Sequence, residues 1–270
     1  MKLGISSYTY PWAIGLPDAQ PAQPLTPLQL MEKAQELGVG IVQFGPNMPL
    51  DKLPEKDLRE VVKRADSWKI DLELATIGFD PARLKYQIQF ARKIGAILLK
   101  TTPERPDGTL PARIEIAEAL RSIVDDLKDA EIGLALDNSR MQAQELNELL
   151  GSVRSTWLGA ALDTATPMAI PQGWQISVRV LTSRTLSLHI KDFMVNPLDH
   201  GMGYSIQGCP VGKGKLNIAW LMESIAAIRV EPSVFVESWT PAQKTLEETI
   251  ALEHAWAKQG VEYLRKFIVD

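Results

Sequence analysis

Eight short apolar segments recur along the chain, each followed by a stretch with helical periodicity, and this alternation restricts the fold more than any other feature. The segments begin near Leu3, Gly40, Ile70, Ala96, Ile132, Trp157, Thr185 and Ser233. Several are continuously apolar, which is typical of parallel strands that helices cover on both faces of a sheet. Eight strand–helix units predict one (β/α)8 TIM barrel over residues 1–270, with an open doubly wound sheet as the alternative.

Helix boundary signals follow several of these strands. Thr26 and Asp80 each stand before a proline, so both are expected N-cap residues. A third helix is expected to start at Pro111 and to continue to Leu127, and Pro241 is expected to start the last one. No G-x-G-x-x-G sequence follows the first strand, which favours the barrel over the doubly wound sheet.

Composition excludes several classes of protein. The chain carries 29 Lys and Arg against 33 Asp and Glu, a formal net charge of -4, and no basic stripe, so we expect no nucleic-acid partner. No apolar run approaches the length needed to span a bilayer, and no secretory signal is evident, so we expect a cytoplasmic protein without membrane contact. The single cysteine, Cys209, excludes an intrachain disulfide, and nothing in the sequence excludes a homo-oligomer.

Four consecutive strands of the second half end in side chains that bind metals. The predicted strands lead into Asp137, Asp163, His189 and Glu237. The carboxyl ends of barrel strands meet at one rim, where the active sites of such barrels lie. Three carboxylates and one imidazole suit one divalent ion (Mn²⁺, Mg²⁺, Co²⁺ or catalytic Zn²⁺). The alternative interpretation is that each side chain only caps the helix that follows it.

The whole chain resembles the sugar phosphate isomerase/epimerase group of xylose isomerase-like barrels, which also includes endonuclease IV. The resemblance is carried by Leu136-Asp137-Asn138, Leu162-Asp163-Thr164, His189-Ile190-Lys191-Asp192, Gly208-Cys209-Pro210-Val211-Gly212-Lys213-Gly214 and Val236-Glu237-Ser238-Trp239. It implies one divalent metal ion held by Asp137, Asp163, His189 and Glu237. The group usually has Glu where Asp137 stands, and often has His where Ser139 stands.

The resemblance also implies the chemistry, which is proton transfer at a carbon beside a carbonyl of a sugar or polyol. Glu237 and Asp137 would be the acid–base pair and Lys191 a further proton carrier. Because Asp137 is shorter than Glu, a lyase such as a dehydratase of a keto-inositol is the alternative, and a non-catalytic ligand-binding barrel is another. Endonuclease activity is disfavoured, since the chain has three histidines in total.

Further side chains are expected around the carbohydrate substrate. The candidates for substrate contact are Tyr10, Trp12, Glu73, Lys100, Asp192, Lys213 and Trp239, with Tyr8 beside the first two. Aromatic rings there would cover the apolar face of a sugar, or else pack beneath the loop. Glu73 and Lys100 would otherwise pair with each other, and Lys191 with Asp192 or Glu237. The glycine-rich segment 196–214 is expected to form a lid or a structured rim.

Overall fold

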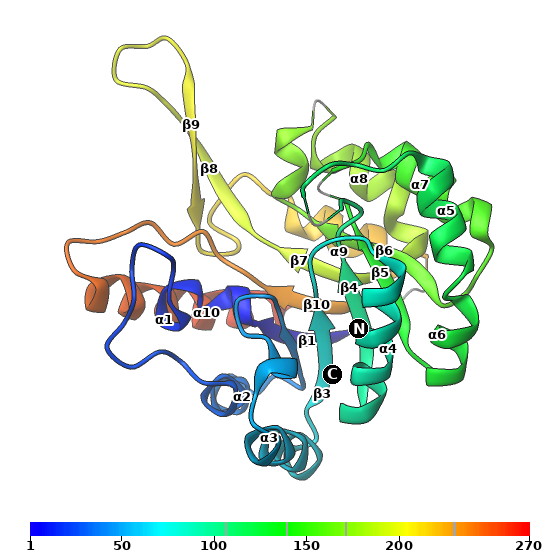
Figure 1. Cartoon of the computed structure of the whole chain (residues 1–270). Helices are drawn as coiled ribbons and strands as arrows, with labels where there is room; N and C mark the ends of the chain where they lie inside the picture. Colours follow the sequence, from blue (N-terminus) through cyan, green and yellow to red (C-terminus); the bar gives the residue numbers. More distant parts are fainter. Residues whose placement is uncertain (106, 139, 171, 229–230) are drawn as a thin grey trace.

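Eight parallel strands close into a barrel in the computed structural model, which describes residues 1–105, 107–138, 140–170, 172–228 and 231–270 (Figure 1). The barrel strands are β1 (Lys2–Ser6), β2 (Ile41–Phe44), β3 (Asp71–Ala75), β4 (Ala96–Thr101), β5 (Gly133–Asp137), β6 (Leu158–Asp163), β7 (Thr185–Ile190) and β10 (Ser233–Val236). Their order around the barrel is β1-β10-β7-β6-β5-β4-β3-β2. The predicted TIM barrel is therefore confirmed, and the open sheet is excluded.

Helices form the outer layer around the barrel (Figure 1). They are α1 (Pro11–Ile14), α2 (Pro27–Glu36), α3 (Glu55–Trp68), α4 (Pro81–Ile94), α5 (Arg113–Arg121), α6 (Val124–Ala130), α7 (Ala143–Val153), α8 (Trp174–Leu181), α9 (Ile218–Ala226) and α10 (Leu246–Leu264). The predicted caps are confirmed, because the side chains of Thr26 and Asp80 accept hydrogen bonds from backbone N–H groups of the first turns of α2 and α4.

Two predicted helix boundaries are wrong. The helix expected from Pro111 to Leu127 is divided into α5 and α6, and the hydroxyl of Ser122 donates to the carbonyl of Ala119 where they separate. A side-chain bond of this kind competes with the regular helical pattern. The last helix begins at Leu246 rather than at Pro241, because the side chain of Thr245 supplies its N-cap.

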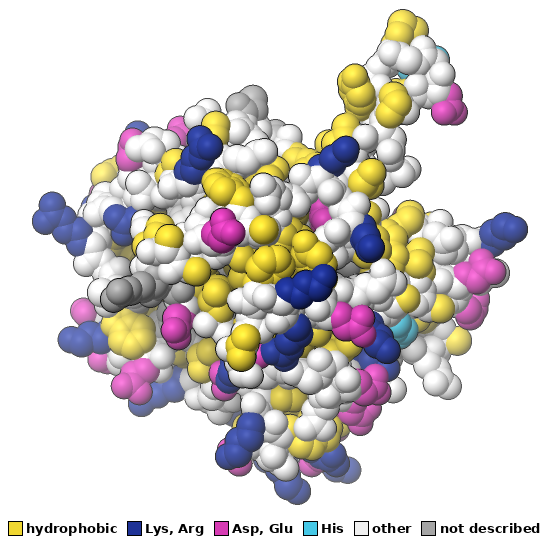
Figure 2. Space-filling model, turned by 180° about the vertical axis from the view of Figure 1, so that it is seen from behind, with side chains coloured by type: hydrophobic (Ala, Val, Ile, Leu, Met, Phe, Trp, Pro, Cys, Tyr) yellow, Lys and Arg dark blue, Asp and Glu magenta, His cyan; other side chains and the backbone are white. Residues whose placement is uncertain are grey.

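The segment after β7, for which a lid or a structured rim was predicted, forms a long antiparallel hairpin. It comprises β8 (Asp192–Pro197) and β9 (Tyr204–Cys209), and it stands away from the barrel in both views of the whole molecule (Figures 1 and 2). In the part of the chain described here, no helix has both the length and the apolar character needed to cross a bilayer.

The main core lies between the barrel and its helices, and the barrel interior is partly polar. Alternate strand residues such as Leu134 and Leu188 face the helices and are fully buried. The interior contains a small apolar cluster of Leu98, Ala135 and Ala161, whereas polar side chains collect nearer the carboxyl ends of the strands. This arrangement concentrates the polar groups at one rim of the barrel.

Candidate active site

Asp163, His189 and Glu237 come together at the carboxyl ends of three neighbouring strands. Each offers one ligand atom, and these atoms lie within 4.8 Å of one another. The strand register explains the convergence, because Asp163 on β6 lies opposite His189 on β7, and the N–H of Glu237 donates to the carbonyl of Ile190. All three side chains are buried.

The imidazole of His189 is held with its Nδ1 atom toward Glu237. Nδ1 lies 3.1 Å from Glu237 Oε1, and Nε2 lies 3.1 Å from the hydroxyl of Ser187. Burial lowers the pKa of His189, and the charge of Lys100 lowers it further, so the ring is neutral at pH 7. Nδ1 is buried without a well-formed hydrogen bond. A neutral imidazole nitrogen beside two carboxylates is a donor set that fits a divalent ion.

Lys191 lies between the two carboxylates of this cluster. Its ammonium pairs with Asp163 and, at 2.6 Å, with Glu237 Oε2. Burial alone would lower the pKa of Lys191, but the two carboxylates outweigh burial and raise it above the usual value. Burial would likewise raise the pKa of Glu237, but Lys191 and His189 hold it well below the usual value. Lys191 is therefore a permanent cation beside an ionised Glu237.

Asp137, the remaining predicted ligand, lies against a different cation. Its carboxylate is 2.7 Å from the ammonium of Lys100, and it does not belong to the group of three close ligand atoms. The structure thus brings together three of the four predicted ligands and places Asp137 in an ion pair. Ser139, where the related group often has His, lies outside the described residues.

Ser6 and Tyr8 complete the site from β1 and the turn that follows it. The hydroxyl of Ser6 donates to Glu237 Oε1 and accepts from the backbone N–H of Tyr8. Burial raises the pKa of Tyr8, and the nearby charge of Glu237 raises it further, so the phenol stays protonated. A Cβ atom on Gly45 would lie 2.7 Å from the Tyr8 ring, so this glycine gives the ring its space. Sequence reasoning missed Ser6, although it ends a strand as the predicted ligands do.

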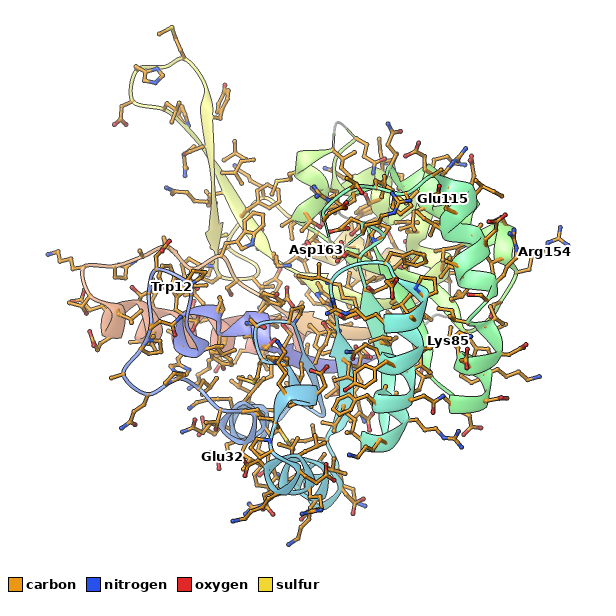
Figure 3. All side chains as sticks on the ribbon, viewed as in Figure 1. Trp12, Glu32, Lys85, Glu115, Arg154 and Asp163 are labelled. Carbon is orange, nitrogen blue, oxygen red and sulfur yellow. The ribbon has the colours of Figure 1, made fainter. Side chains whose placement is uncertain are left out.

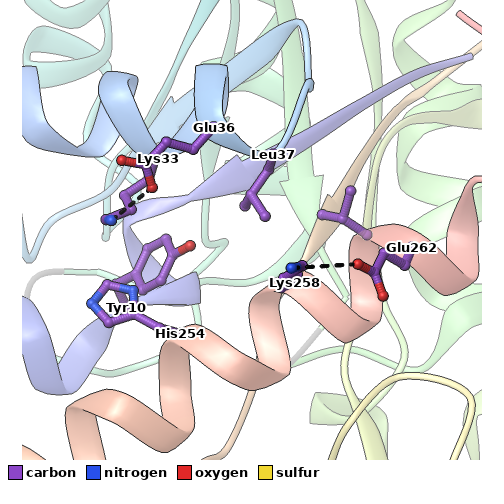
Figure 4. A pocket seen from close by; sticks show the side chains of 8 residues that line it. Tyr10, Lys33, Glu36, Leu37, His254, Lys258 and Glu262 are labelled. Atoms are coloured by element: carbon purple, nitrogen blue, oxygen red, sulfur yellow. Dashed lines mark hydrogen bonds and ion pairs between the residues drawn. The ribbon is translucent and has the colours of Figure 1, made fainter.

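The other aromatic candidates are held by groups outside the cluster. Tyr10 lines a cavity of about 350 Å³ between α2 and α10, and its ring packs against His254 (Figure 4). The indole of Trp12 donates to the carbonyl of Thr240, and Figure 3 shows Trp12 well apart from Asp163. Trp239 is 41% exposed and its backbone lies against Gly208 at the base of the hairpin.

Glu73 is buried inside the barrel and does not form the alternative ion pair with Lys100. Its Oε2 atom accepts a hydrogen bond of 2.9 Å from the side chain of Gln43. Burial raises the pKa of Glu73 to about 7. Glu73 therefore belongs to the polar interior of the barrel, below the cluster that ends β6 and β7.

Asp192 organises the backbone that returns from the hairpin. Its two carboxylate oxygens accept hydrogen bonds from the backbone N–H groups of Phe193, Gly212, Gly214 and Leu216. A Cβ atom on Gly214 would lie 2.1 Å from Asp192 Oδ1, so glycine is required there. The predicted alternative pair between Lys191 and Asp192 is not among the ion pairs of the described residues, and Lys213 is exposed in the same turn.

Three comparisons connect this geometry to known proteins. The model of a family described as xylose isomerase-like TIM barrel matches residues 79–267. The 3-oxo-isoapionate decarboxylase of Pectobacterium atrosepticum is 26% identical over 265 residues, which cover 98% of this chain and 95% of the relative.

Solved structures share the fold over nearly the full length. D-psicose 3-epimerase with D-tagatose from Clostridium cellulolyticum H10 has a TM-score of 0.73 at 16% identity, and the match covers 99% of each chain. The IOLI protein with a zinc atom has a TM-score of 0.72 at 17% identity and 100% coverage of both chains. A Mycobacterium smegmatis barrel in complex with magnesium has a TM-score of 0.71 at 14% identity, covering 97% of each. At these identities the structures establish the fold alone.

Proposed function

The chain belongs to the xylose isomerase-like TIM barrel family, and we propose that it is a metal-dependent lyase that decarboxylates a sugar-derived 3-oxo acid. The observation that carries this proposal is the pairing of charges at the barrel rim, where Lys100 holds Asp137 and Lys191 lies between Asp163 and Glu237. The relative whose name describes the decarboxylation of 3-oxo-isoapionate supports the same class of reaction.

The charge of the site favours an anionic substrate over a neutral sugar. The three carboxylates and two lysines together carry a net charge of -1, because His189 is neutral. One bound divalent ion would change the net charge to +1. A carboxylate substrate would then be attracted to the rim, whereas a neutral ketose would gain nothing from it.

Asp163, His189 and Glu237 would hold the ion, because their ligand atoms already converge and Nδ1 of His189 has no well-formed hydrogen bond. The ion would supply positive charge to the substrate oxygens that become negative during the reaction. The family resemblance implies a fourth ligand at Asp137, whose Oδ2 atom pairs with Lys100 in this structure.

The side chains of this protein then have distinct tasks. In a 3-oxo acid, the bond between the carboxyl carbon and its neighbour breaks, its electron pair moves toward the carbonyl, and CO2 leaves. The neighbouring carbon, now part of an enolate, takes up a proton. Lys191 stays charged and attracts the substrate carboxylate, whereas the protonated phenol of Tyr8, whose pKa the charge of Glu237 raises, is the candidate proton donor. Burial of the cluster keeps bulk water from competing.

An isomerase or epimerase is the second candidate, and the strand order favours it. Glu237 follows β10 and Asp137 ends β5, so β7 and β6 separate the two carboxylates around the rim. Carboxylates placed on different sides of a bound ketose could remove a proton from one face and return it to the other. Asp137 would act in this way only when it is not neutralised by Lys100.

The two candidates differ in their products. Manganese-loaded protein is incubated in D2O with 3-oxo sugar acids or with ketoses, and both released CO2 and deuterium at carbon are measured. We expect CO2 release from an oxo acid, a loss of at least a hundredfold in Lys191→Met, and no loss in Lys215→Met, which removes an exposed lysine from the same segment. Deuterium exchange into a ketose without CO2 release would establish the second candidate instead, and inactivity on both substrates would reject both.

A further inference from the structure

The hairpin of residues 192–209, called the arm below, has one entirely apolar face. Residues directly opposite each other in an antiparallel pair project from the same face, and so do residues two apart along a strand. The register pairs Val195 with Ile206 and Pro197 with Tyr204, so these four side chains share one face of the ribbon. A face of this composition is normally buried.

In this chain the apolar face of the arm is open to solvent. Tyr204 is 74% exposed and Ile206 is 49% exposed, and Met202 in the connecting turn is 79% exposed. With Val195 and Leu198, these side chains expose about 500 Å² of mostly apolar surface, which is near the upper end of the largest apolar patches on soluble monomers, and patches of that size often have a function. Figure 2 shows the apolar side chains along the arm, clear of the rest of the molecule.

Apart from Pro197 on β8, the arm also lacks the features that protect an isolated hairpin. Neither strand pairs with a third strand among the described residues, and an isolated two-stranded ribbon is marginally stable in water. Residues 192–212 contain no lysine or arginine, the residues that commonly discourage pairing at exposed sheet edges. The opposite face carries the pairs Asn196–Ser205 and Met194–Gln207, so it is the more polar of the two.

We propose that the apolar face of the arm docks on the barrel of a second copy of this chain. The two copies would form a two-fold dimer in which the arm of each packs on the barrel of the other. Two arms, each covered by a similar area of the partner barrel, would bury about 2,000 Å² in total, which is the size of a stable protein interface. Two arms packed only against each other would bury about half of that area, at the lower limit for specific association. A reciprocal, closed contact also avoids growth into filaments.

A second copy fits this face better than a membrane or a nucleic acid. Anionic lipids and phosphates attract lysine and arginine, and residues 192–212 have neither, whereas Asp199 in the turn is acidic. A permanently open apolar face also requires a partner that is always present at the same concentration. The same chain meets this condition, and closed homo-oligomers are the commonest soluble assemblies.

The test compares two lysine pairs placed at adjacent positions of the arm. Val195→Lys with Ile206→Lys puts two like charges on the apolar face, and Asn196→Lys with Ser205→Lys puts the same charges on the polar face one step along the ladder. Sedimentation velocity from 1 to 100 µM measures the mass, and circular dichroism checks that the barrel remains folded. We expect a dimer for the unmodified chain and the polar-face variant, and a dissociation constant at least a hundredfold weaker for the apolar-face variant.

A second measurement keeps the proposal open to refutation if the apolar-face variant unfolds. Backbone hydrogen exchange of residues 195–206 in the unmodified chain should become faster on dilution below the dissociation constant, while exchange in β5 should not change. A monomeric unmodified chain at 100 µM overturns the proposal, as does a dimer that survives the apolar-face pair with unchanged affinity. Sedimentation of a monomer with phosphatidylcholine–phosphatidylserine vesicles would assign the face to lipid instead.

Discussion

Glu73 should make the protein less stable as the pH rises from 5 to 8, and Glu73→Gln should remove that dependence. The carboxyl group is fully buried in the barrel, and burial raises its pKa from 4.5 to about 7. Between these two pH values the folded chain keeps a proton that the unfolded chain releases. The stability that the neutral carboxyl contributes is complete below pH 4.5 and is lost as the pH rises through about 7.

The size of the effect follows from the two pKa values. At about 1.4 kcal/mol per pH unit, the interval from 4.5 to about 7 corresponds to about 3.5 kcal/mol of unfolding free energy, most of which is lost between pH 5 and pH 8. A glutamine keeps the shape and still accepts the hydrogen bond from Gln43, but it does not ionise. The variant should therefore match the unmodified protein near pH 5 and be about 3 kcal/mol more stable at pH 8.

Urea unfolding at pH 5, 6, 7 and 8 measures this difference. Glu253 is also buried, with a pKa that burial raises to about 8, but it is present in both proteins and cancels in the comparison. Glu118→Gln, at an exposed position on α5, is the control and should change nothing at any pH. A stability gap between Glu73→Gln and the unmodified chain that is the same at pH 5 and pH 8 would refute the reasoning.

Three further outcomes are expected. His189→Ala should bind Mn²⁺ at least tenfold more weakly in titration calorimetry, because it removes one of three converging ligands, and equal affinity would count against the metal site. Tyr8→Phe should lower kcat about a hundredfold with little change in KM, since only the proton donor is lost, and an unchanged kcat would remove Tyr8 from the reaction. Asp192→Ala should lower the unfolding free energy by about 3 kcal/mol in urea, because four backbone N–H groups lose their acceptor, and a loss below about 1 kcal/mol would contradict that role.

The barrel was predictable because its strands are short, apolar and separated by capped helices. Strands such as β5 and β6 are buried on both faces, so their sequences carry a strong signal with little dependence on distant contacts. The hairpin was not predictable on the same grounds. Its glycines, Gly201, Gly203 and Gly208, suggest a loop, and its apolar alternation serves a face that this chain does not cover. Because this apolar alternation matches no contact within the chain, sequence reasoning had no internal packing partner from which to predict the strand pair.

The three converging ligands were predictable because strand ends in a closed barrel share one rim. Side-chain direction beyond the strand end was not predictable. After β1 the chain turns through a short 3-10 helix over Ser7–Thr9, which leaves Tyr8 where the charge of Glu237 acts on it and turns Tyr10 outward to α2 and α10. The choice of Lys100 as partner for Asp137 also depends on tertiary contacts between strands, which sequence spacing alone does not specify.

The polar interior of the barrel links the stability of the fold to the geometry of the site. The side-chain amide of Gln43 lies between Glu73 and Ser187, at 2.9 and 3.5 Å, and Ser187 contacts Nε2 of His189. An apolar residue at position 73 would avoid the cost of a buried carboxyl group, but it would leave the amide of Gln43 short of an acceptor. The Gln43 amide would then compete with His189 for the Ser187 hydroxyl. That hydroxyl contacts Nε2 of His189 and so helps to orient the imidazole ring. The buried carboxyl that lowers the stability of the barrel as the pH rises is therefore also the first member of a chain of contacts that reaches Nε2 of His189.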